Sequence, residues 1–323
     1  MRAYRWGILG AGNIAAKFAA AVNFTKGSEL FAVASRDINK AKSFAEKFNA
    51  SKAYDDYLQL IEDPEVDIIY IATPHAFHRE QALLCLNHKK AVLCEKPMAL
   101  NFKQVSEMVD AAKNNHVFLM EGMWSRFMPS INKVVELIKD DMIGPVQFIR
   151  ADFGFQAPFD PQGRLFNTRL GGGSLLDVGI YPLFLTTLLL GEPSVIQSFG
   201  KLSETGADEY CSMQFQYPGG QVANIFSSIT MKTSLTAEIV GTRGKIFLPA
   251  AFYKATSVTV ELNNGETSSF TFPFEHNGFE YEVREVISCL DEGFLQSELI
   301  PHQTSLLLAR LMDTVREQCG IVY

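Results

Sequence analysis

Short apolar runs alternate with amphipathic stretches over the first third of the chain. Runs of this length, bounded by polar residues or glycine, are typical of parallel strands buried on both faces. The stretches between several of the runs have helical spacing and end near residues 22, 87 and 115, so the sequence predicts a doubly wound β-α-β sheet. The predicted strands cover residues 4–9, 30–34, 66–72, 91–94 and 117–120.

Beyond Gly122 the pattern changes from alternating strands and helices to a long series of strands. Residues 210–217 and 258–262 alternate apolar and polar side chains, as strands with one buried face do. The sequence therefore predicts an α/β domain over residues 1–122 and an α+β domain, with a large open, mainly antiparallel sheet, over residues 123–323. Turns are predicted at 217–220, 241–244 and 263–265, and helices near 131–140, 281–290 and 303–318.

The first predicted strand runs directly into Gly10-Ala11-Gly12-Asn13-Ile14-Ala15, which opens a helix. This is the G-x-G-x-x-A form of the dinucleotide fingerprint of Rossmann domains. Gly10 can make the tight turn, Gly12 lets the backbone approach a pyrophosphate, and the helix N-terminus offers free N–H groups. We therefore expect Gly10, Gly12, Asn13 and Ile14 to bind a dinucleotide cofactor.

The residues after the second strand bear on the choice of cofactor. An NAD site usually has an acidic residue here for the ribose hydroxyl, whereas an NADP site supplies a cation. The chain has Ser35-Arg36-Asp37, in which Arg36 can bind a 2′-phosphate and Ser35 can donate a hydroxyl. Asp37 can instead cap the helix that begins near Ile38. The pattern favours NADP(H), with NAD(H) possible.

The run 91–94 ends in Glu95-Lys96-Pro97. Pro97 has no N–H to donate and stops the strand, so Lys96 is expected at the carboxyl end of the sheet, where ligands of open α/β sheets bind. Taken alone, these residues also fit a surface Glu-Lys pair that opens a loop.

Thr73-Pro74-His75 follows the strand at 66–72, and we expect His75 to lie in a loop over the cofactor. His75 and His78 have a spacing that can occur in metal sites, but no further ligands follow at a suitable distance. We therefore predict no metal site, and we interpret His78 as an ordinary surface residue of the next helix.

Composition narrows the class of protein. The chain is 47% hydrophobic and 20% charged, as globular proteins are, and no uninterrupted apolar run has the length of a membrane span. A net charge of −7 without basic runs argues against a nucleic-acid surface. We expect a cytoplasmic protein with no membrane partner. The five scattered cysteines suggest reduced core thiols and neither a disulfide framework nor a zinc site.

The order of these motifs resembles the Gfo/Idh/MocA oxidoreductase family, and the resemblance covers nearly the whole chain. Further matches suggest the dimeric dihydrodiol dehydrogenase branch of the family. Many relatives have histidine at the position of Tyr181, whereas this branch has tyrosine there. The resemblance implies a homodimer in which a second subunit covers the open sheet. The matching segments are 10–15, 73–75, 95–97, 119–127 and 171–181.

The resemblance also implies catalytic roles for Lys96, Asp177 and Tyr181. Tyr181 would act as the acid or base on the substrate hydroxyl, Lys96 would favour its phenolate form, and Asp177 would orient the pair. If residues 174–181 are helical, Asp177 and Tyr181 project from one face, and Pro182 implies a kink or break. Without the resemblance, Tyr181 fits a core aromatic and Asp177 a surface or capping carboxylate.

The aromatic residues near residue 125 and residue 155 are candidates for a substrate wall. About half of the candidates should be core residues instead. We expect Trp124, Arg126 and Phe155 to contact substrate, together with some of Phe127, Phe153 and Phe159.

The predicted function is an NAD(P)-dependent oxidoreductase that moves a hydride between nicotinamide and a secondary alcohol or ketone. The substrate would be a cyclic diol or a sugar, which the sequence does not distinguish. The alternative is a non-catalytic dinucleotide-binding regulator on the same scaffold. Retention of Lys96, Asp177 and Tyr181 together argues against a regulator, which needs the phosphate loop and no proton relay.

Overall fold

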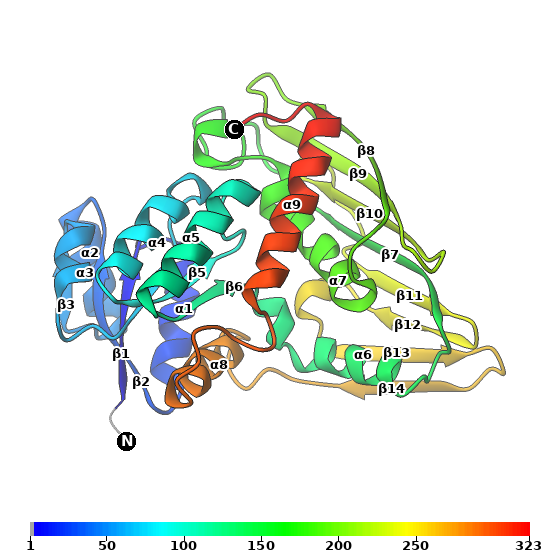
Figure 1. Cartoon of the computed structure of the whole chain (residues 1–323), viewed down its shortest axis with the longest axis horizontal. Coiled ribbons are helices and arrows are strands. Elements are labelled where there is room, and N and C mark those ends of the chain that lie inside the picture. Colours follow the sequence, from blue (N-terminus) through cyan, green and yellow to red (C-terminus); the bar gives the residue numbers. More distant parts are fainter. Residues whose placement is uncertain (1–2) are drawn as a thin grey trace. The chain divides into compact units, whose positions relative to one another are not determined.

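The computed structural model describes residues 3–323 and contains a parallel sheet near the N-terminus (Figure 1). Its strand order is β3-β2-β1-β4-β5-β6. Strands β4 and β5 are wholly buried, which explains their continuous apolar runs. The strands are β1 (Tyr4–Leu9), β2 (Ser28–Ala34), β3 (Lys52–Tyr54), β4 (Ile68–Ile71), β5 (Ala91–Glu95) and β6 (Leu119–Gly122).

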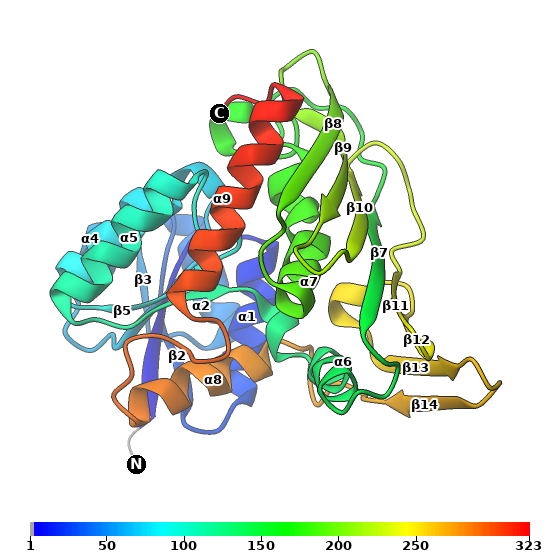
Figure 2. The same cartoon turned by 45° about the vertical axis from the view of Figure 1, so that its right-hand side comes forward.

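Helices connect these strands, and several begin at side chains that cap them. Asp37 accepts hydrogen bonds from the backbone of Asn39 and Lys40 at the start of α2, and Asn101 caps α5 in the same way. Figures 1 and 2 both show α4 and α5 side by side. The helices are α1 (Asn13–Phe24), α2 (Ile38–Phe48), α3 (Tyr57–Glu62), η1 (His75–Phe77), α4 (His78–Asn87), α5 (Phe102–Asn115) and η2 (Trp124–Phe127).

The second sheet has eight strands in the order β14-β13-β12-β11-β7-β10-β9-β8. Its pairs are antiparallel except for β7 with β10, which run parallel. The predicted mainly antiparallel sheet is therefore confirmed. The strands are β7 (Val146–Gly154), β8 (Val195–Leu202), β9 (Asp208–Gln216), β10 (Val222–Ser228), β11 (Ala237–Gly241), β12 (Gly244–Leu248), β13 (Ser257–Leu262) and β14 (Thr267–Thr271).

Helix α7 (Ile180–Leu190) packs on this sheet against β7 and β10, as Figure 2 shows. A π-helical turn, η4 (Leu175–Gly179), leads into it. The helical stretch Thr168–Leu190 is apolar and long enough to cross a membrane by length and composition, but 78% of its most apolar window is buried inside the protein. The remaining helices are α6 (Pro129–Lys139), η3 (Thr168–Leu170), η5 (Phe252–Lys254), α8 (Glu280–Asp291) and α9 (His302–Cys319).

The chain divides into two compact units. The first runs to Phe127 and takes up Phe274–Leu306 again, and the second comprises Met128–Pro273 and Leu307–Tyr323. Helix α8 thus packs with the parallel sheet's unit although it follows the second sheet in sequence. The assignment of residues 1–122 to the cofactor and 123–323 to substrate and dimerisation stays a prediction.

Candidate active site

The carboxyl ends of three neighbouring strands bring the predicted cofactor residues of the first unit to one edge. In the strand register Leu9 of β1 pairs with Ile71 of β4, and Ile71 pairs with Cys94 of β5. The segments that follow these strands begin at Gly10, Ala72 and Lys96, so they leave the sheet at the same edge. The strand order also reverses between β1 and β4, the switch point where open α/β sheets bind ligands.

The glycine loop has the geometry that a dinucleotide needs. Gly10 has a φ of 96°, in the left-handed region, and a Cβ there would lie 3.0 Å from the Ala72 carbonyl oxygen. Gly12 stands at the N-cap of α1, and a Cβ there would meet no atom within 4 Å. No side chain caps this helix. The space beside Gly12 therefore fits a pyrophosphate held by the helix N-terminus at Asn13 and Ile14.

The structure places the three residues after β2 differently from one another. Ser35 is buried, Arg36 is exposed, and Asp37 caps α2. Asp37 therefore has a structural role as a helix cap that requires no cofactor. This is the alternative role that the sequence suggested for it. The charge of Arg36 acts on the Tyr57 phenol, lowering its pKa, although burial dominates and raises that pKa overall. Arg36 is therefore close enough to act on Tyr57 at the start of α3, and its exposed guanidinium is a candidate to bind an anion.

His78 is not the surface residue that we predicted, because its side chain is fully buried. Its ring nitrogens lie 2.9 Å from the Pro97 carbonyl oxygen and 2.8 Å from that of Thr73. His78 therefore ties the loop after β5 to the loop after β4. Burial lowers its pKa, while both carbonyl contacts favour the imidazolium. The ring of His75, which is also buried, lies 5.7 Å from that of His78.

The first unit contains three buried carboxyl groups, two of which feel the charge of Lys96. Glu95 accepts a hydrogen bond from the Tyr70 hydroxyl, and Glu121 accepts one from the backbone N–H of Met98 at 2.9 Å. Both oxygens of Glu282, on α8, are buried without a hydrogen-bond partner. Burial raises the pKa of all three carboxyls, and the charge of Lys96 opposes that rise at Glu95 and Glu121.

In the second unit, Asp177 is buried on the η4 turn and forms an ion pair with Arg164. The two guanidinium nitrogens of Arg164 lie 2.6 and 3.4 Å from the carboxylate oxygens. The irregularity expected from Pro182 takes the form of this π-helical turn, since Pro182 cannot donate to a carbonyl one turn back. Arg164 therefore compensates the charge of Asp177. It lies in a loop, and no motif or periodic pattern in the sequence predicted that it belongs to the site.

Glycines let that loop and the second sheet approach the η4 turn. A Cβ at Gly172 would lie 2.7 Å from the Arg164 carbonyl oxygen, and one at Gly173 would lie 2.0 Å from Oδ1 of Asp208. Asp208 Oδ2 accepts hydrogen bonds of 2.7 Å from Ser174 Oγ and from the Leu175 N–H. Gly172 and Gly173 thus allow neighbouring elements of the same chain to approach closely.

Tyr181 lies at the start of α7, is 8% exposed, and packs among aromatic rings. Its ring centroid is 5.5 Å from that of Phe153 and 4.9 Å from that of Tyr253, and those two rings stack on each other at 4.5 Å. Tyr253 was not among the candidates, because a residue in the short η5 turn carries no periodic signal. The cluster offers an apolar wall beside the ring of Tyr181.

The three predicted substrate residues are divided between the units. Trp124 and Arg126 belong to the first unit and are buried; Trp124 stacks on Phe279 at 4.5 Å. Arg126 Nε donates to the Leu299 carbonyl oxygen at 2.9 Å, and burial lowers the pKa of its guanidinium. Phe155 is half-buried in the second unit.

A cavity of about 390 Å³ lies in the second unit beside Arg164. It is lined by the loop between Ala157 and Phe166, and Phe159 is 51% exposed there. Among residues 3–323, no group of three or more His, Cys, Asp or Glu side chains is arranged to hold a metal ion.

Comparison with known proteins identifies the scaffold. Residues 4–123 match the model of an oxidoreductase family with an NAD-binding Rossmann fold, and residues 131–247 match the GFO/IDH/MocA C-terminal domain. The trans-1,2-dihydrobenzene-1,2-diol dehydrogenase of Danio rerio is 38% identical, covering 99% of this chain and 98% of that protein. The Homo sapiens protein of the same name is 36% identical with the same coverage.

Solved structures agree on the fold. An aldose-aldose oxidoreductase from Caulobacter crescentus, complexed with glycerol, superposes with a TM-score of 0.90 at 26% identity, covering 99% of this chain and 98% of that one. KijD10, a 3-ketoreductase from Actinomadura kijaniata, superposes with a TM-score of 0.89 at 24% identity over 98% of each chain. The resemblance to dihydrodiol dehydrogenases is confirmed, and the enzyme is favoured over the regulator. The chain belongs to the Gfo/Idh/MocA oxidoreductase family, as an NAD(P)-dependent dehydrogenase or reductase acting on CH–OH groups.

Proposed function

We propose that this enzyme transfers a hydride between nicotinamide and a secondary alcohol or ketone of a cyclic diol or a sugar. The proposal rests on one observation above all: Lys96 leaves β5 at the edge where the glycine loop and Thr73 leave β1 and β4. The names of the curated relatives support a cyclic diol, and the aldose-aldose oxidoreductase supports a sugar. The apolar rings beside Tyr181 suit a cyclic diol or the apolar face of a sugar.

We propose that the cofactor is NADP(H) in preference to NAD(H). The glycine loop would hold the pyrophosphate, and Ser35 and Arg36 would hold the adenosine end. Thr73, Pro74, His75, Glu95 and Lys96 would line the nicotinamide end. When bound, the cofactor accepts or supplies the hydride.

The protein's own groups would then move the proton of the substrate hydroxyl. Tyr181 would donate it in reduction and accept it in oxidation, and Lys96 would donate a hydrogen bond to the substrate oxygen and stabilise the phenolate. Asp177, held by Arg164, would orient this pair. The tyrosine ring packed among Phe153 and Tyr253 is fixed in place, as an acid or base must be.

Replacing Lys96 by methionine tests the proposal. Lys96→Met keeps much of the side chain's bulk and removes the charge, so kcat with the best substrate should fall by about 10²-fold or more while the cofactor Kd changes little. A panel of dihydrodiols and sugars, followed by NADPH absorbance, identifies that substrate. Lys103→Met, on the exposed face of α5, is the control. Turnover within a few-fold of the parent enzyme would show that Lys96 only opens a loop.

We further propose a cytoplasmic homodimer. The edge strand β8 of the second sheet exposes Phe199 at 68% and Val195 at 45%, which supports a partner surface on this sheet. Light scattering at micromolar concentration should give twice the chain mass of 36.0 kDa. A monomer at that concentration would contradict the dimer without affecting the proposed chemistry.

A further inference from the structure

Two cysteines of the second unit meet where strand β8 has no side chain. Gly200 of β8 pairs with Cys211 of β9 in the sheet register. A Cβ built on Gly200 would lie 3.4 Å from Cys211 Sγ and also 3.4 Å from Cys319 Sγ. Both sulfurs therefore lie beside Gly200, and the missing side chain of this glycine leaves the space in which they approach each other.

The end of α9 is fixed on β8 by several contacts, so the approach of Cys319 is part of the packing. The Gln318 side chain accepts from the Ser198 N–H at 2.7 Å and donates to the Ile196 carbonyl oxygen at 2.9 Å. Cys319 is the next residue and is partly exposed, whereas Cys211 is buried. Cys319 is therefore the more accessible of the two thiols.

The chemistry of the pair suits thiol oxidation. A hydrogen bond from Cys211, with help from Ser198, lowers the pKa of Cys319 and so favours its thiolate form. Cys211 keeps its proton, because the hydrogen bond to Cys319 and burial raise its pKa. The pair therefore combines a reachable nucleophilic thiolate with a neighbouring thiol that can resolve its oxidation product.

We propose that Cys211 and Cys319 form a reversible disulfide on exposure to a peroxide. The Cys319 thiolate attacks a peroxide oxygen, the O–O bond breaks, and a sulfenic acid forms on Cys319 as the other oxygen leaves and becomes water. The Cys211 sulfur then attacks the sulfenic sulfur and releases a second water. The two thiols lose two electrons in all, and the peroxide gains them.

The disulfide would change the hydrogen bonding of Asp208, whose carboxylate holds the start of the η4 turn that carries Asp177. Cys211 Sγ lies 3.4 Å from Asp208 Oδ2, the oxygen that also binds Ser174 and Leu175. Oxidation removes the single S–H proton of Cys211, which the reduced thiol can donate either to this oxygen or to Cys319. The redox state of the pair is thereby connected to the segment that carries Asp177.

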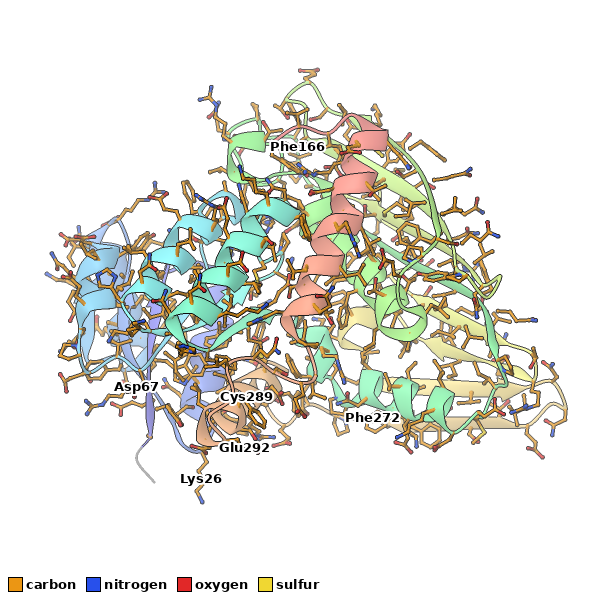
Figure 3. All side chains as sticks on the ribbon, in the orientation of Figure 1. Lys26, Asp67, Phe166, Phe272, Cys289 and Glu292 are labelled. Atoms are coloured by element: carbon orange, nitrogen blue, oxygen red, sulfur yellow. The ribbon has the colours of Figure 1, made fainter. Side chains whose placement is uncertain are left out.

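Peptide mass spectrometry under non-reducing conditions tests the proposal. After treatment with hydrogen peroxide and blocking of free thiols, we expect one linked peptide pair containing Cys211 and Cys319, lost on addition of dithiothreitol. Cys319→Ser should abolish the linked pair, and Cys211→Ser should leave Cys319 as sulfenic or sulfinic acid. Cys289→Ser, on α8 of the other unit (Figure 3), should leave the linkage intact.

The parent enzyme alone can overturn the proposal, even if a variant fails to fold. Conversion of Cys319 to sulfinic acid without a linked peptide, or a fully reduced Cys319 at peroxide doses that oxidise exposed methionines, would each contradict it. Linkage of Cys211 or Cys319 to a different cysteine would do so as well.

Discussion

The carboxyl edge of the parallel sheet and the segment from Asp177 to Tyr181 are built by different means. At the edge, backbone geometry places the groups: strands end in register, and glycines turn the chain. Around Asp177, side chains from separate segments hold the site, with Arg164 on the carboxylate and Phe153 and Tyr253 on Tyr181. Backbone-built sites tolerate surface substitutions, whereas a site built from side chains depends on each contributor.

The largest effect is expected at Tyr181. Tyr181→Phe keeps the ring and its packing and removes only the hydroxyl, so fold and cofactor affinity should persist. General acid–base catalysis contributes about 10²- to 10⁴-fold, and kcat should fall by that factor and lose its pH dependence. Tyr4→Phe, which removes a hydroxyl that donates to Asp291 at the surface, is the control. Near-normal turnover with an unchanged pH profile would assign the proton to Lys96 or His75.

Arg36 tests the backbone-built region. The loss of a hydrogen bond to a charged group costs about 1.5 to 3 kcal/mol, so Arg36→Ala should weaken NADP(H) binding by roughly 10- to 150-fold. NAD(H) binding should change much less, which makes it the internal control in fluorescence titrations. Equal losses for both cofactors would refute the role of Arg36 in binding the 2′-phosphate.

Arg164 tests the side-chain-built region with a smaller effect, because half of its side chain is exposed to solvent. Arg164→Met should lower kcat by about 10-fold, through loss of one charged hydrogen-bond partner of Asp177, and leave the cofactor Kd unchanged. Arg164→Lys should recover part of the loss. Arg169→Met, an exposed arginine of the same segment, should be silent, and a similar loss there would point to a general effect of charge.

The smallest expected effect concerns stability and its pH dependence at Glu282. Its folded pKa lies well above the ordinary value of 4.5, so the folded state must keep a proton that the unfolded chain releases above about pH 4.5. The parent protein therefore loses stability as the pH rises above that value. Glu282→Gln removes this loss and should stabilise the protein by roughly 1 to 2 kcal/mol at pH 7 and hardly at all near pH 4.

Thermal unfolding at both pH values measures the Glu282 effect. Glu292→Gln, at the exposed end of α8 (Figure 3), should show no such difference. A Glu282→Gln variant that is destabilised at pH 7 would mean that Glu282 is ionised and held by a favourable partner.

The same contrast explains what the sequence could predict. The glycine loop, Lys96 and the alternation of strands are local patterns, and the sheet and its edge followed from them. His78 was misread because its spacing fits a helix surface, while the two loops that bury it close over it only in three dimensions. Arg164 lies 13 residues before Asp177, and Tyr253 lies on the short η5 turn beyond β12. Both are in irregular segments, and no periodicity connects them with Asp177 or Tyr181.

The central claim is that Lys96, from the backbone-built region, and Tyr181, from the side-chain-built region, act on one substrate oxygen. A double-mutant cycle with Lys96→Met and Tyr181→Phe, measured as kcat for hydride transfer in single turnovers, tests it most directly. Groups that work as a unit are strongly non-additive, so the double variant should be little slower than the slower single variant. Losses that multiply would show that the two residues act independently and would contradict the claim.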